Sequence, residues 1–358
     1  MSLLRHIRTI TLIAGALVSA SGFGQSAAEP SAPTATAPVS SPIYVPVTVS
    51  DFWQGFWRNY APMPASSSPG PDDIAGWDAT RTTMDAVISS FSDPKLAEHW
   101  GLSLQKGVRG GVPVLEVTSP GTKPDARLLI YVHGGAYTFE SAQLCVLNAA
   151  LMARATGLRV ISIDYTLAPR GKWQAVTEQV VAVYRALIKE GRHPRSMGMY
   201  GESAGGGLVA GAVLKMRDLG IALPGALVLW SPWADITAAG DSYGTLSKAE
   251  PFLTAAGLQA SADAYALRAD QKNPYVSPVY GDFSRGFPPT LIQGGTKEIF
   301  LSHFIRLYQA IDSAGGEAKL DLYDGMPHVF QIIGPDSPEG KLALAKSARF
   351  MAAHLATK

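Results

Sequence analysis

The chain has 358 residues, of which 47% are hydrophobic and 16% charged, so it can bury a sizeable core and lacks the composition of a disordered protein. Its 30 basic and 29 acidic side chains give a formal net charge of +1 without a long run of Lys and Arg, which argues against nucleic-acid binding. The single cysteine, Cys145, excludes an intrachain disulfide and a cysteine-based zinc site, and the histidines show no HExxH-type spacing, so we expect no metal.

The N-terminus carries the pattern of a targeting segment. Arg5 and Arg8 form a short positive start, and the apolar stretch after them is shorter than the roughly 20 residues that span a membrane. We therefore expect residues 1–28 to be a secretory signal peptide and the mature protein to be periplasmic or secreted, without a stable membrane anchor. Residues 29–49, rich in Pro, Ala, Ser and Thr, are expected to form a disordered linker.

Residues 50–101 contain several Trp and Phe residues and a helical pattern at 79–91. After them, short apolar segments typical of strands alternate with longer segments typical of helices. The expected strands are 114–117, 127–132, 159–163, 197–200, 226–230, 290–293 and 319–323, and the expected helices are 142–155, 174–190, 205–219, 302–314 and 339–354. The continuous apolar run LLIYV in the second strand is typical of burial on both faces. This alternation predicts the α/β class, with a mostly parallel, doubly wound sheet.

One segment interrupts the alternation. Residues 236–287 place about fifty residues, rich in Ala, Tyr and Pro, between two expected core strands, which is too long for a simple loop. We expect them to form, together with residues 50–101, a helical cap over the active edge of the sheet. The core then consists of residues 102–235 and 288–358.

The pentapeptide GESAG at residues 201–205 fits the pattern G-x-S-x-G and makes Ser203 the candidate nucleophile. By chance alone, a chain of this composition would contain roughly 0.3 such matches, so the context decides. The pentapeptide follows the expected strand at 197–200 and precedes a helical pattern, and a nucleophile elbow requires this strand–turn–helix order. A glycine-rich helix start without chemistry is the alternative.

A second motif, HGGAY at residues 133–137, directly follows the expected strand at 127–132. A tetrahedral acyl intermediate needs backbone N–H donors directed at its oxygen, and a glycine loop together with the residue after the nucleophile can supply them. The candidate donors of this oxyanion hole are the N–H groups of Gly134, Gly135, Ala136 and Ala204. A tight turn without a catalytic role is the alternative for the Gly-Gly pair.

Five motifs occur in a fixed order: HGGAY, DYTLAP at 164–169, GESAGG at 201–206, SPWAD at 231–235 and GMPHVF at 325–330. From residue 127 to the C-terminus, about two thirds of its length, the chain resembles the hormone-sensitive-lipase-like esterases, also called bacterial lipolytic family IV. The resemblance implies an α/β-hydrolase fold with a helical cap, no cofactor, and hydrolysis of carboxylic esters with short or medium acyl chains. The chain departs from the family at Ala136, where the third glycine of HGGG stands, and at Glu202, where many members carry Asp.

The candidate base is one of seven histidines. This fold places the acid and then the histidine after the serine in the chain, which leaves His303, His328 and His354. His354 ends the last expected helix, and His303 opens a helix and is expected to face solvent. His328 follows the last expected strand through a turn and lies in GMPHVF, so it is the candidate base. His133 is expected to brace the turn of HGGAY.

The acid is expected on the loop after the strand at 290–293, which reads GGTKEI. Many members of the resembled family carry Asp where Lys297 stands here, and Lys cannot serve as the acid. Glu298 is the only carboxylate on this loop and is our candidate, since Glu serves as well as Asp in this fold. The alternatives are Asp235 after the preceding strand, Asp324 on the loop of the base, and an exposed Glu298 that only begins a helix.

Together these residues predict a serine carboxylesterase in which Ser203 attacks the ester, His328 accepts its proton and Glu298 orients the imidazole. The expected partner is a small-molecule ester, without cofactor, metal ion, nucleic acid or stable membrane anchor, and a homodimer remains open. An amidase, a lactonase or a deacetylase would use the same machinery. A non-catalytic ligand receptor on this fold is the alternative of a different class, although such a protein is expected to have lost a member of the triad.

Overall fold

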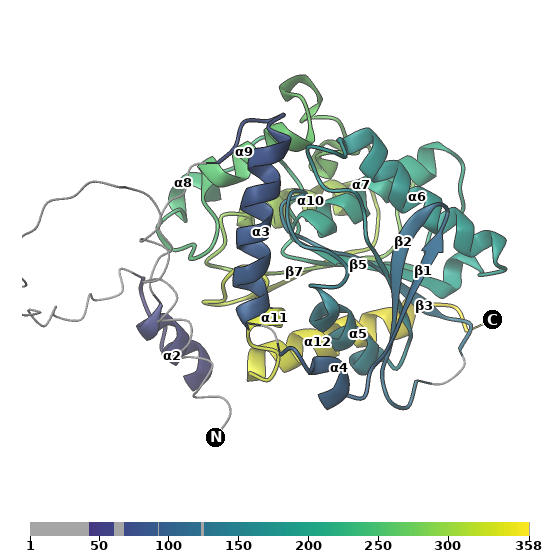
Figure 1. Cartoon of the computed structure of the whole chain (residues 1–358), viewed down its shortest axis with the longest axis horizontal. Helices are drawn as coiled ribbons and strands as arrows, with labels where there is room; N and C mark the ends of the chain where they lie inside the picture. Colours follow the sequence, from purple (N-terminus) through teal and green to yellow (C-terminus); the bar gives the residue numbers. More distant parts are fainter. Residues whose placement is uncertain (1–42, 61–67, 92, 123–124, 358) are drawn as a thin grey trace, which may run out of the picture.

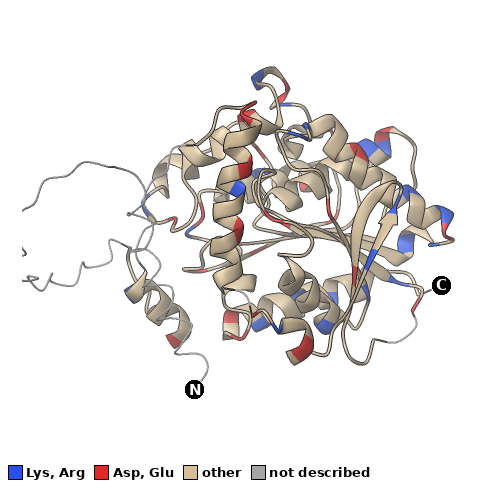
Figure 2. Ribbon diagram, in the orientation of Figure 1, with Lys and Arg blue, Asp and Glu red and all other residues tan. Residues whose placement is uncertain are grey.

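The computed structural model describes residues 43–60, 68–91, 93–122 and 125–357 (Figure 1). The expected signal peptide, residues 1–28, and most of the expected linker lie outside these residues. The last part of the linker, residues 43–49, is described and has Ile43 and Val49 buried in an apolar cluster, so the expectation of disorder is wrong there. In the described ranges, no helix combines the length and the apolar character that crossing a membrane requires. Acidic and basic residues are interspersed over the described helices and strands (Figure 2).

The core is an eight-stranded sheet with the strand order β1-β2-β4-β3-β5-β6-β7-β8. Its strands are β1 (Ser103–Arg109), β2 (Val112–Thr118), β3 (Leu128–Val132), β4 (Val160–Ile163), β5 (Met197–Glu202), β6 (Ala226–Trp230), β7 (Thr290–Gly295) and β8 (Ala318–Tyr323). β2 pairs antiparallel with both β1 and β4, and all other neighbours are parallel. The predicted α/β class and mostly parallel sheet are therefore confirmed.

The sequence patterns missed one strand, β1. Its residues, SLQKGVR, are exposed or half-buried along their whole length, because β1 lies at the edge of the sheet and pairs only with β2. An edge strand needs no apolar run, and charged residues on it discourage pairing with another chain. A search for apolar runs could therefore not find it.

Helices cover both faces of the sheet, as in a doubly wound fold (Figure 1). α6 (Trp173–Lys189), α7 (Ala204–Asp218) and α10 (Leu301–Ser313) pack on one face, and α5 (Val146–Thr156) and α12 (Pro338–His354) pack on the other. These five helices correspond to the five predicted core helices.

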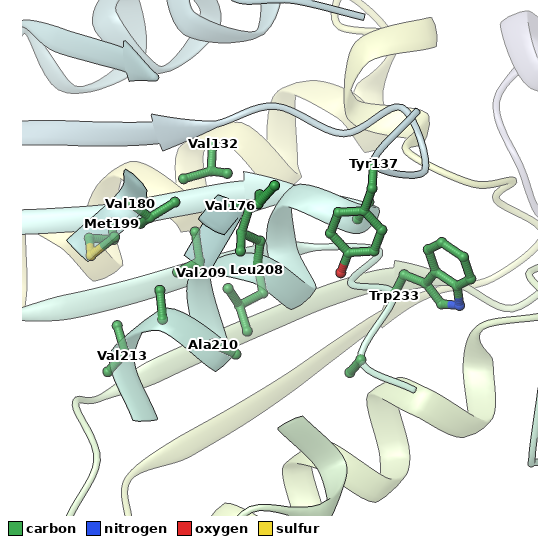
Figure 3. Close-up of a cluster of buried hydrophobic side chains, with 14 of the residues drawn as sticks. Val132, Tyr137, Val176, Val180, Met199, Leu208, Val209, Ala210, Val213 and Trp233 are labelled. Atoms are coloured by element: carbon green, nitrogen blue, oxygen red, sulfur yellow. The ribbon is translucent and has the colours of Figure 1, made fainter. Parts of the chain in front are cut away.

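Burial on both faces explains the apolar sequence of β3. Successive side chains of a strand point to opposite faces of the sheet, so a strand that is covered on both sides has no solvent-facing position. Alternate residues of β3 belong to the cluster on one face (Leu128, Ile130, Val132) and to the cluster on the other (Leu129, Tyr131). Figure 3 shows the first cluster, in which Val132 and Met199 of the strands lie near valine side chains of α6 and α7.

The two segments predicted to form a cap contain several helices, of which the longest has 18 residues and the others are shorter. The first contains α2 (Asp51–Asn59), α3 (Ile74–Phe91) and α4 (Leu96–His99), and the second contains α8 (Ser242–Thr245), α9 (Ala255–Tyr265) and the 3-10 helices η3 (Arg268–Asp270) and η4 (Pro278–Tyr280); η2 (Pro194–Ser196) and α11 (Phe330–Ile333) belong to the core.

Both segments contact the loop that follows β3, residues 133–140, which we call the oxyanion loop. The guanidinium group of Arg81, on α3, donates to the carbonyl oxygen of Thr138 in this loop. The hydroxyl of Ser261, on α9, is hydrogen-bonded to the hydroxyl of the same Thr138 at 3.0 Å. These contacts place α3 and α9 at the edge of the sheet where the sequence motifs meet.

Candidate active site

Ser203 occupies a sharp turn between β5 and α7, since β5 ends at Glu202 and α7 begins at Ala204. Its backbone has φ 54° and ψ −124°, a conformation that is strained for a residue with a side chain. A Cβ atom at Gly205 would lie 2.1 Å from the carbonyl oxygen of Val132, so only glycine fits there. The strand–turn–helix context predicted for GESAG is therefore present.

Backbone hydrogen bonds fix Ser203 against the end of the neighbouring strand β6. Its N–H donates to the carbonyl oxygen of Trp230 at 2.9 Å, and its own carbonyl oxygen accepts from the N–H of Trp233 at 2.8 Å. The residue is 8% exposed, so little of the nucleophile is open to solvent. The elbow and the end of β6 therefore form one fixed unit.

The candidate acid and base are in direct contact. Glu298 Oε2 and His328 Nδ1 lie 2.7 Å apart, and the residues are 0% and 5% exposed. Glu298 follows β7 and His328 follows β8, and these parallel strands end at the same edge of the sheet as β5, which carries Ser203. A carboxylate on Nδ1 fixes the orientation of the ring and leaves Nε2 for proton transfer. The structure thus joins two of the three predicted residues at the edge that carries the third.

The hydroxyl of Ser231 is a functional group that the sequence analysis missed. It donates to Glu298 Oε1 at 2.8 Å and accepts from the N–H of Val329 at 3.1 Å, so it links the acid to the loop of the base. The N–H of Gly295 also donates to Glu298 Oε1. Both carboxylate oxygens of Glu298 are therefore held. The motif SPWAD, used only for the family resemblance, is the sequence feature that could have identified Ser231.

The alternative acids are engaged elsewhere. Asp235 is fully buried and accepts hydrogen bonds from the side chains of Tyr280 and Arg306. Asp324 accepts a hydrogen bond from the hydroxyl of Thr48. Within the described ranges, neither carboxylate is hydrogen-bonded to the candidate base, whereas Glu298 is.

The other two late histidines have structural surroundings. The expectation that His303 faces solvent is wrong, because position 303 lies on the apolar face by which α10 packs on the sheet. Its ring is fully buried against Tyr243 and Phe300, and burial lowers its pKa to about 3. His354 lies at the end of α12, as predicted, with Nε2 at 3.3 Å from a carboxylate oxygen of Glu317.

The oxyanion loop supplies fewer donors than the sequence predicts. The N–H of Gly134 donates to Glu202 Oε1 at 2.9 Å, so Gly134 does not serve as an oxyanion donor here and this part of the prediction is corrected. Ala136 has φ 51°, so it adopts a conformation that glycine reaches without strain. Among the described residues, the N–H groups of Gly135, Ala136 and Ala204 have no acceptor. These three stay the candidate donors.

Glu202 connects the oxyanion loop to the elbow. Its Oε1 accepts hydrogen bonds from the hydroxyl of Tyr131 at 2.6 Å, the N–H of Gly134 at 2.9 Å and the side-chain amide of Asn148 at 3.0 Å. Burial, with a smaller contribution from the nearby Glu140, raises the pKa of Glu202 to about 8. In the sequence, Glu202 stands out only as a departure from the resembled family. Its position next to the nucleophile lets it hold the loop that faces the nucleophile.

Replacing Glu202 with Gln should remove a pH-dependent loss of stability. The pKa of its carboxyl group is about 8 in the folded chain against 4.5 without burial, so the folded state keeps a proton that the unfolded state releases. The free energy of unfolding of the wild type therefore falls as the pH rises from about 4.5 to about 8, by on the order of 5 kcal/mol from this group. Urea unfolding at several pH values measures this slope, which Glu202→Gln should reduce.

Asp336→Asn changes an exposed carboxylate and is the matched control for this prediction. It should keep the pH dependence of the wild type, because the buried carboxyl group of Glu202 is unchanged in this variant. Equal slopes for the wild type and Glu202→Gln would contradict the burial of an ionisable carboxyl group at this position.

Residues 43–60, which we call the N-terminal strap, hold the loops of the acid and the base from outside. Lys297, next to the candidate acid, donates to the carbonyl oxygen of Tyr44 and lies with Nζ 4.6 Å from the ring centroid of Trp57. Trp57 Nε1 in turn donates to the carbonyl oxygen of Gly325, on the loop of the base, at 3.0 Å. The Lys that replaces the Asp of many family members therefore anchors the strap.

We expect Lys297→Met to lower the free energy of unfolding by roughly 1–2 kcal/mol, because it removes a hydrogen bond and a cation–π contact from a mostly buried side chain. Chemical denaturation measures the change. Lys341→Met alters an exposed lysine and should shift the free energy by less than about 0.5 kcal/mol. An equal effect of the two substitutions would show that Lys297 does not anchor the strap.

Comparisons with known proteins agree with this geometry. Residues 129–332 match the family of the alpha/beta hydrolase fold. An acetyl-hydrolase of Streptomyces hygroscopicus is 34% identical over 250 residues, which cover 67% of this chain and 83% of that protein. An esterase of Acinetobacter venetianus is 32% identical, with 76% of this chain and 88% of that protein covered. The crystal structure of an esterase from the bacterial hormone-sensitive lipase family matches with a TM-score of 0.73 at 32% identity and covers 82% of this chain and 93% of that one.

Proposed function

Since the chain belongs to the alpha/beta hydrolase fold family and to its hormone-sensitive-lipase-like esterases, we propose that it hydrolyses short-chain carboxylic esters through Ser203, His328 and Glu298. The similarity to esterases and acetyl-hydrolases identifies the chain as an ester hydrolase. The roles of the individual residues are our proposal. One observation carries that proposal: the 2.7 Å hydrogen bond between Glu298 and His328, at the sheet edge where Ser203 occupies a strained elbow.

In the first half of the reaction, Ser203 Oγ forms a bond to the ester carbonyl carbon while His328 Nε2 takes the hydroxyl proton. Glu298 stabilises the resulting imidazolium through Nδ1. The carbonyl oxygen becomes an anion that accepts hydrogen bonds from the backbone of Gly135, Ala136 and the residue after Ser203. Each such donor typically contributes about 2.7–4 kcal/mol to lowering the barrier. The bond to the alcohol oxygen then breaks, and the alcohol leaves with the proton from His328.

In the second half, water attacks the acyl-enzyme. His328 takes a proton from the water as its oxygen forms a bond to the acyl carbon, and the same N–H donors hold the second oxyanion. The bond between the acyl carbon and Ser203 Oγ breaks, and Oγ recovers its proton from His328. The carboxylic acid is released and the enzyme returns to its starting state without any cofactor.

Buried aromatic rings beside the elbow support a short acyl group. Trp233, whose N–H holds the carbonyl oxygen of Ser203, stacks on Tyr137 of the oxyanion loop at 5.6 Å between ring centroids. Trp233 also stacks on Phe300, at 5.8 Å between ring centroids. All three rings are at most 1% exposed and fill the space next to the nucleophile, which disfavours a long apolar chain there. The acetyl-hydrolase among the relatives is consistent with this preference.

A panel of p-nitrophenyl esters tests the proposal. We expect kcat/KM to be highest for the acetate or the butyrate and to fall by at least about ten-fold for the decanoate, because extra methylene groups must displace packed rings. Fastest turnover of the decanoate would overturn the short-chain preference, and no turnover of any ester would overturn the esterase itself. The anilide p-nitroacetanilide, tested in parallel, separates an amidase from an esterase.

We also propose that the protein is exported. The positive start and short apolar stretch of residues 1–28 support this, although they lie outside the described residues. Fractionation of producing cells, followed by N-terminal sequencing of the mature protein, should find it outside the cytoplasm and lacking these residues. A cytoplasmic protein that retains them would contradict export.

A further inference from the structure

The oxyanion loop begins and ends at side chains that can ligate a metal ion. His133 directly follows β3, Glu140 ends the loop with φ 69°, and Cys145 lies immediately before α5. A ring nitrogen of His133, a carboxylate oxygen of Glu140 and Cys145 Sγ all lie within 4.8 Å of one another. Three potential ligands, which lie within 13 consecutive residues of the sequence, are therefore close together in space at the oxyanion loop.

His133 has a free nitrogen and a fixed tautomer. The ring is fully buried, and its Nδ1 lies 3.1 Å from the carbonyl oxygen of Gly134. A carbonyl oxygen can only accept, so Nδ1 carries the hydrogen and Nε2 carries a lone pair. In the described part of the chain, Nε2 has no hydrogen-bond partner, which is uncommon for a buried polar atom. Histidines that bind metals are oriented in this way, with one ring nitrogen donating to a carbonyl and the other on the metal.

Cys145 and Glu140 are already close to each other. The thiol of Cys145, which is 4% exposed, donates to Glu140 Oε2 at 3.2 Å. Ligands in a tetrahedral zinc site lie roughly 3.5 Å apart, given metal–ligand distances of about 2.0–2.3 Å. Small movements of the three side chains would therefore suffice. Glu140 is only half-buried, so one ligand of the cluster reaches the protein surface.

We propose that His133 Nε2, Glu140 and Cys145 Sγ bind a Zn²⁺ ion that joins the two ends of the oxyanion loop. Thiolate, imidazole and carboxylate are the three ligand types that zinc binds in proteins, and a water completes the tetrahedron. The Cys145 thiol releases its proton to solvent when the metal binds, while the Nδ1–H of His133 keeps its bond to Gly134. The site does not include Ser203, so metal binding and the nucleophile can be tested separately.

The sequence pattern could not have predicted this site. His133, Glu140 and Cys145 match no spacing of a known zinc motif, and the single cysteine excludes only a zinc site built from several cysteines. Only the fold of the loop brings the three side chains together. The expectation of no metal therefore rested on sequence spacing alone.

Cobalt substitution tests the proposal directly, because a Co²⁺–thiolate bond gives a charge-transfer band in the near ultraviolet. The chain has a single cysteine, so such a band can come only from Cys145. The chelator-treated protein, titrated with Co²⁺ at about pH 8, should develop the band with one equivalent of metal, and Zn²⁺ should abolish it by displacement. Absence of the band at saturating Co²⁺ would overturn the proposal.

Thermal unfolding with Zn²⁺ provides a second readout, because an ion that binds only the folded chain raises its Tm. Cys145→Ser should lose both the cobalt band and the rise in Tm, and Glu140→Gln should weaken Co²⁺ binding by at least about ten-fold. Ser203→Ala, with its ligands intact, should keep the band and the rise. If Cys145→Ser shows the same Zn²⁺-dependent rise in Tm as the wild type, the ion binds elsewhere and the proposal fails.

Discussion

Ser203→Ala is expected to lower kcat for p-nitrophenyl acetate by roughly five orders of magnitude or more, because it removes the oxygen that forms the acyl-enzyme. Loss of the serine from a comparable triad costs on the order of 10⁶-fold in kcat, and the remaining rate comes from the oxyanion hole and from substrate binding. KM should change little, since the substrate binds in the same place. Steady-state kinetics on protein purified from a host without background esterase measures both constants.

Ser313→Ala is the matched control, since Ser313 lies at the exposed end of α10 and outside the site. Its kcat should stay within about two-fold of the wild type, in line with a neutral surface substitution. Circular dichroism should show that both variants are folded. If Ser203→Ala keeps more than about 1% of the wild-type kcat, another group is the nucleophile and the assignment is wrong.

The second large effect is expected for Glu298→Gln, which should lower kcat by about 10⁴-fold. The amide keeps the shape of the side chain but loses the charge that stabilises the imidazolium of His328. Its NH₂ group, placed against Nδ1, would also favour the tautomer that carries the hydrogen on Nε2, where it cannot accept the proton of the nucleophile. The loss should lie in kcat, because Glu298 contacts the base and not the substrate. Steady-state kinetics with p-nitrophenyl acetate shows whether the loss lies in kcat or in KM.

Asp235→Asn provides the comparison for the acid, because Asp235 is the buried alternative. It should destabilise the fold by breaking the buried pair with Arg306, yet leave kcat within about ten-fold at a temperature where the chain stays folded. The reverse result, a large loss of kcat in Asp235→Asn and a small one in Glu298→Gln, would move the acid to position 235. Glu298→Asp, which keeps the charge at a shorter reach, should recover part of the activity.

Much of the core could be predicted from the sequence because its central strands are buried on both faces. The strand β3 has the sequence LLIYV and the strand β6 has the sequence ALVLW. Short, continuous apolar runs of this kind predict strands that are buried on both faces. The positions of Ser203, Glu298 and His328 followed from the predicted strands β5, β7 and β8, since each residue lies just beyond the end of one of them. Parallel strands bring those ends to one edge, so residues far apart in the chain become neighbours.

Other features depend on contacts that no local pattern records. The direction of the Gly134 N–H is set by the carboxylate of Glu202, and a glycine pair alone does not show which of its donors is already used. The burial of His303 depends on which face α10 turns to the sheet. The hydroxyl of Ser231 gains its role only because the acid loop folds next to it. All three features depend on tertiary contacts, which the spacing of residues in the sequence does not reveal.

Labelling with a fluorophosphonate, followed by peptide mapping with mass spectrometry, tests the account most directly. The reagent phosphonylates a serine only where a base activates it and an oxyanion hole holds the phosphoryl oxygen, so it reports the assembled site in one experiment. We expect a single adduct on Ser203 that forms as activity is lost and forms far more slowly in Glu298→Gln. An adduct on another residue, or continued ester hydrolysis by the protein with Ser203 fully labelled, would contradict it.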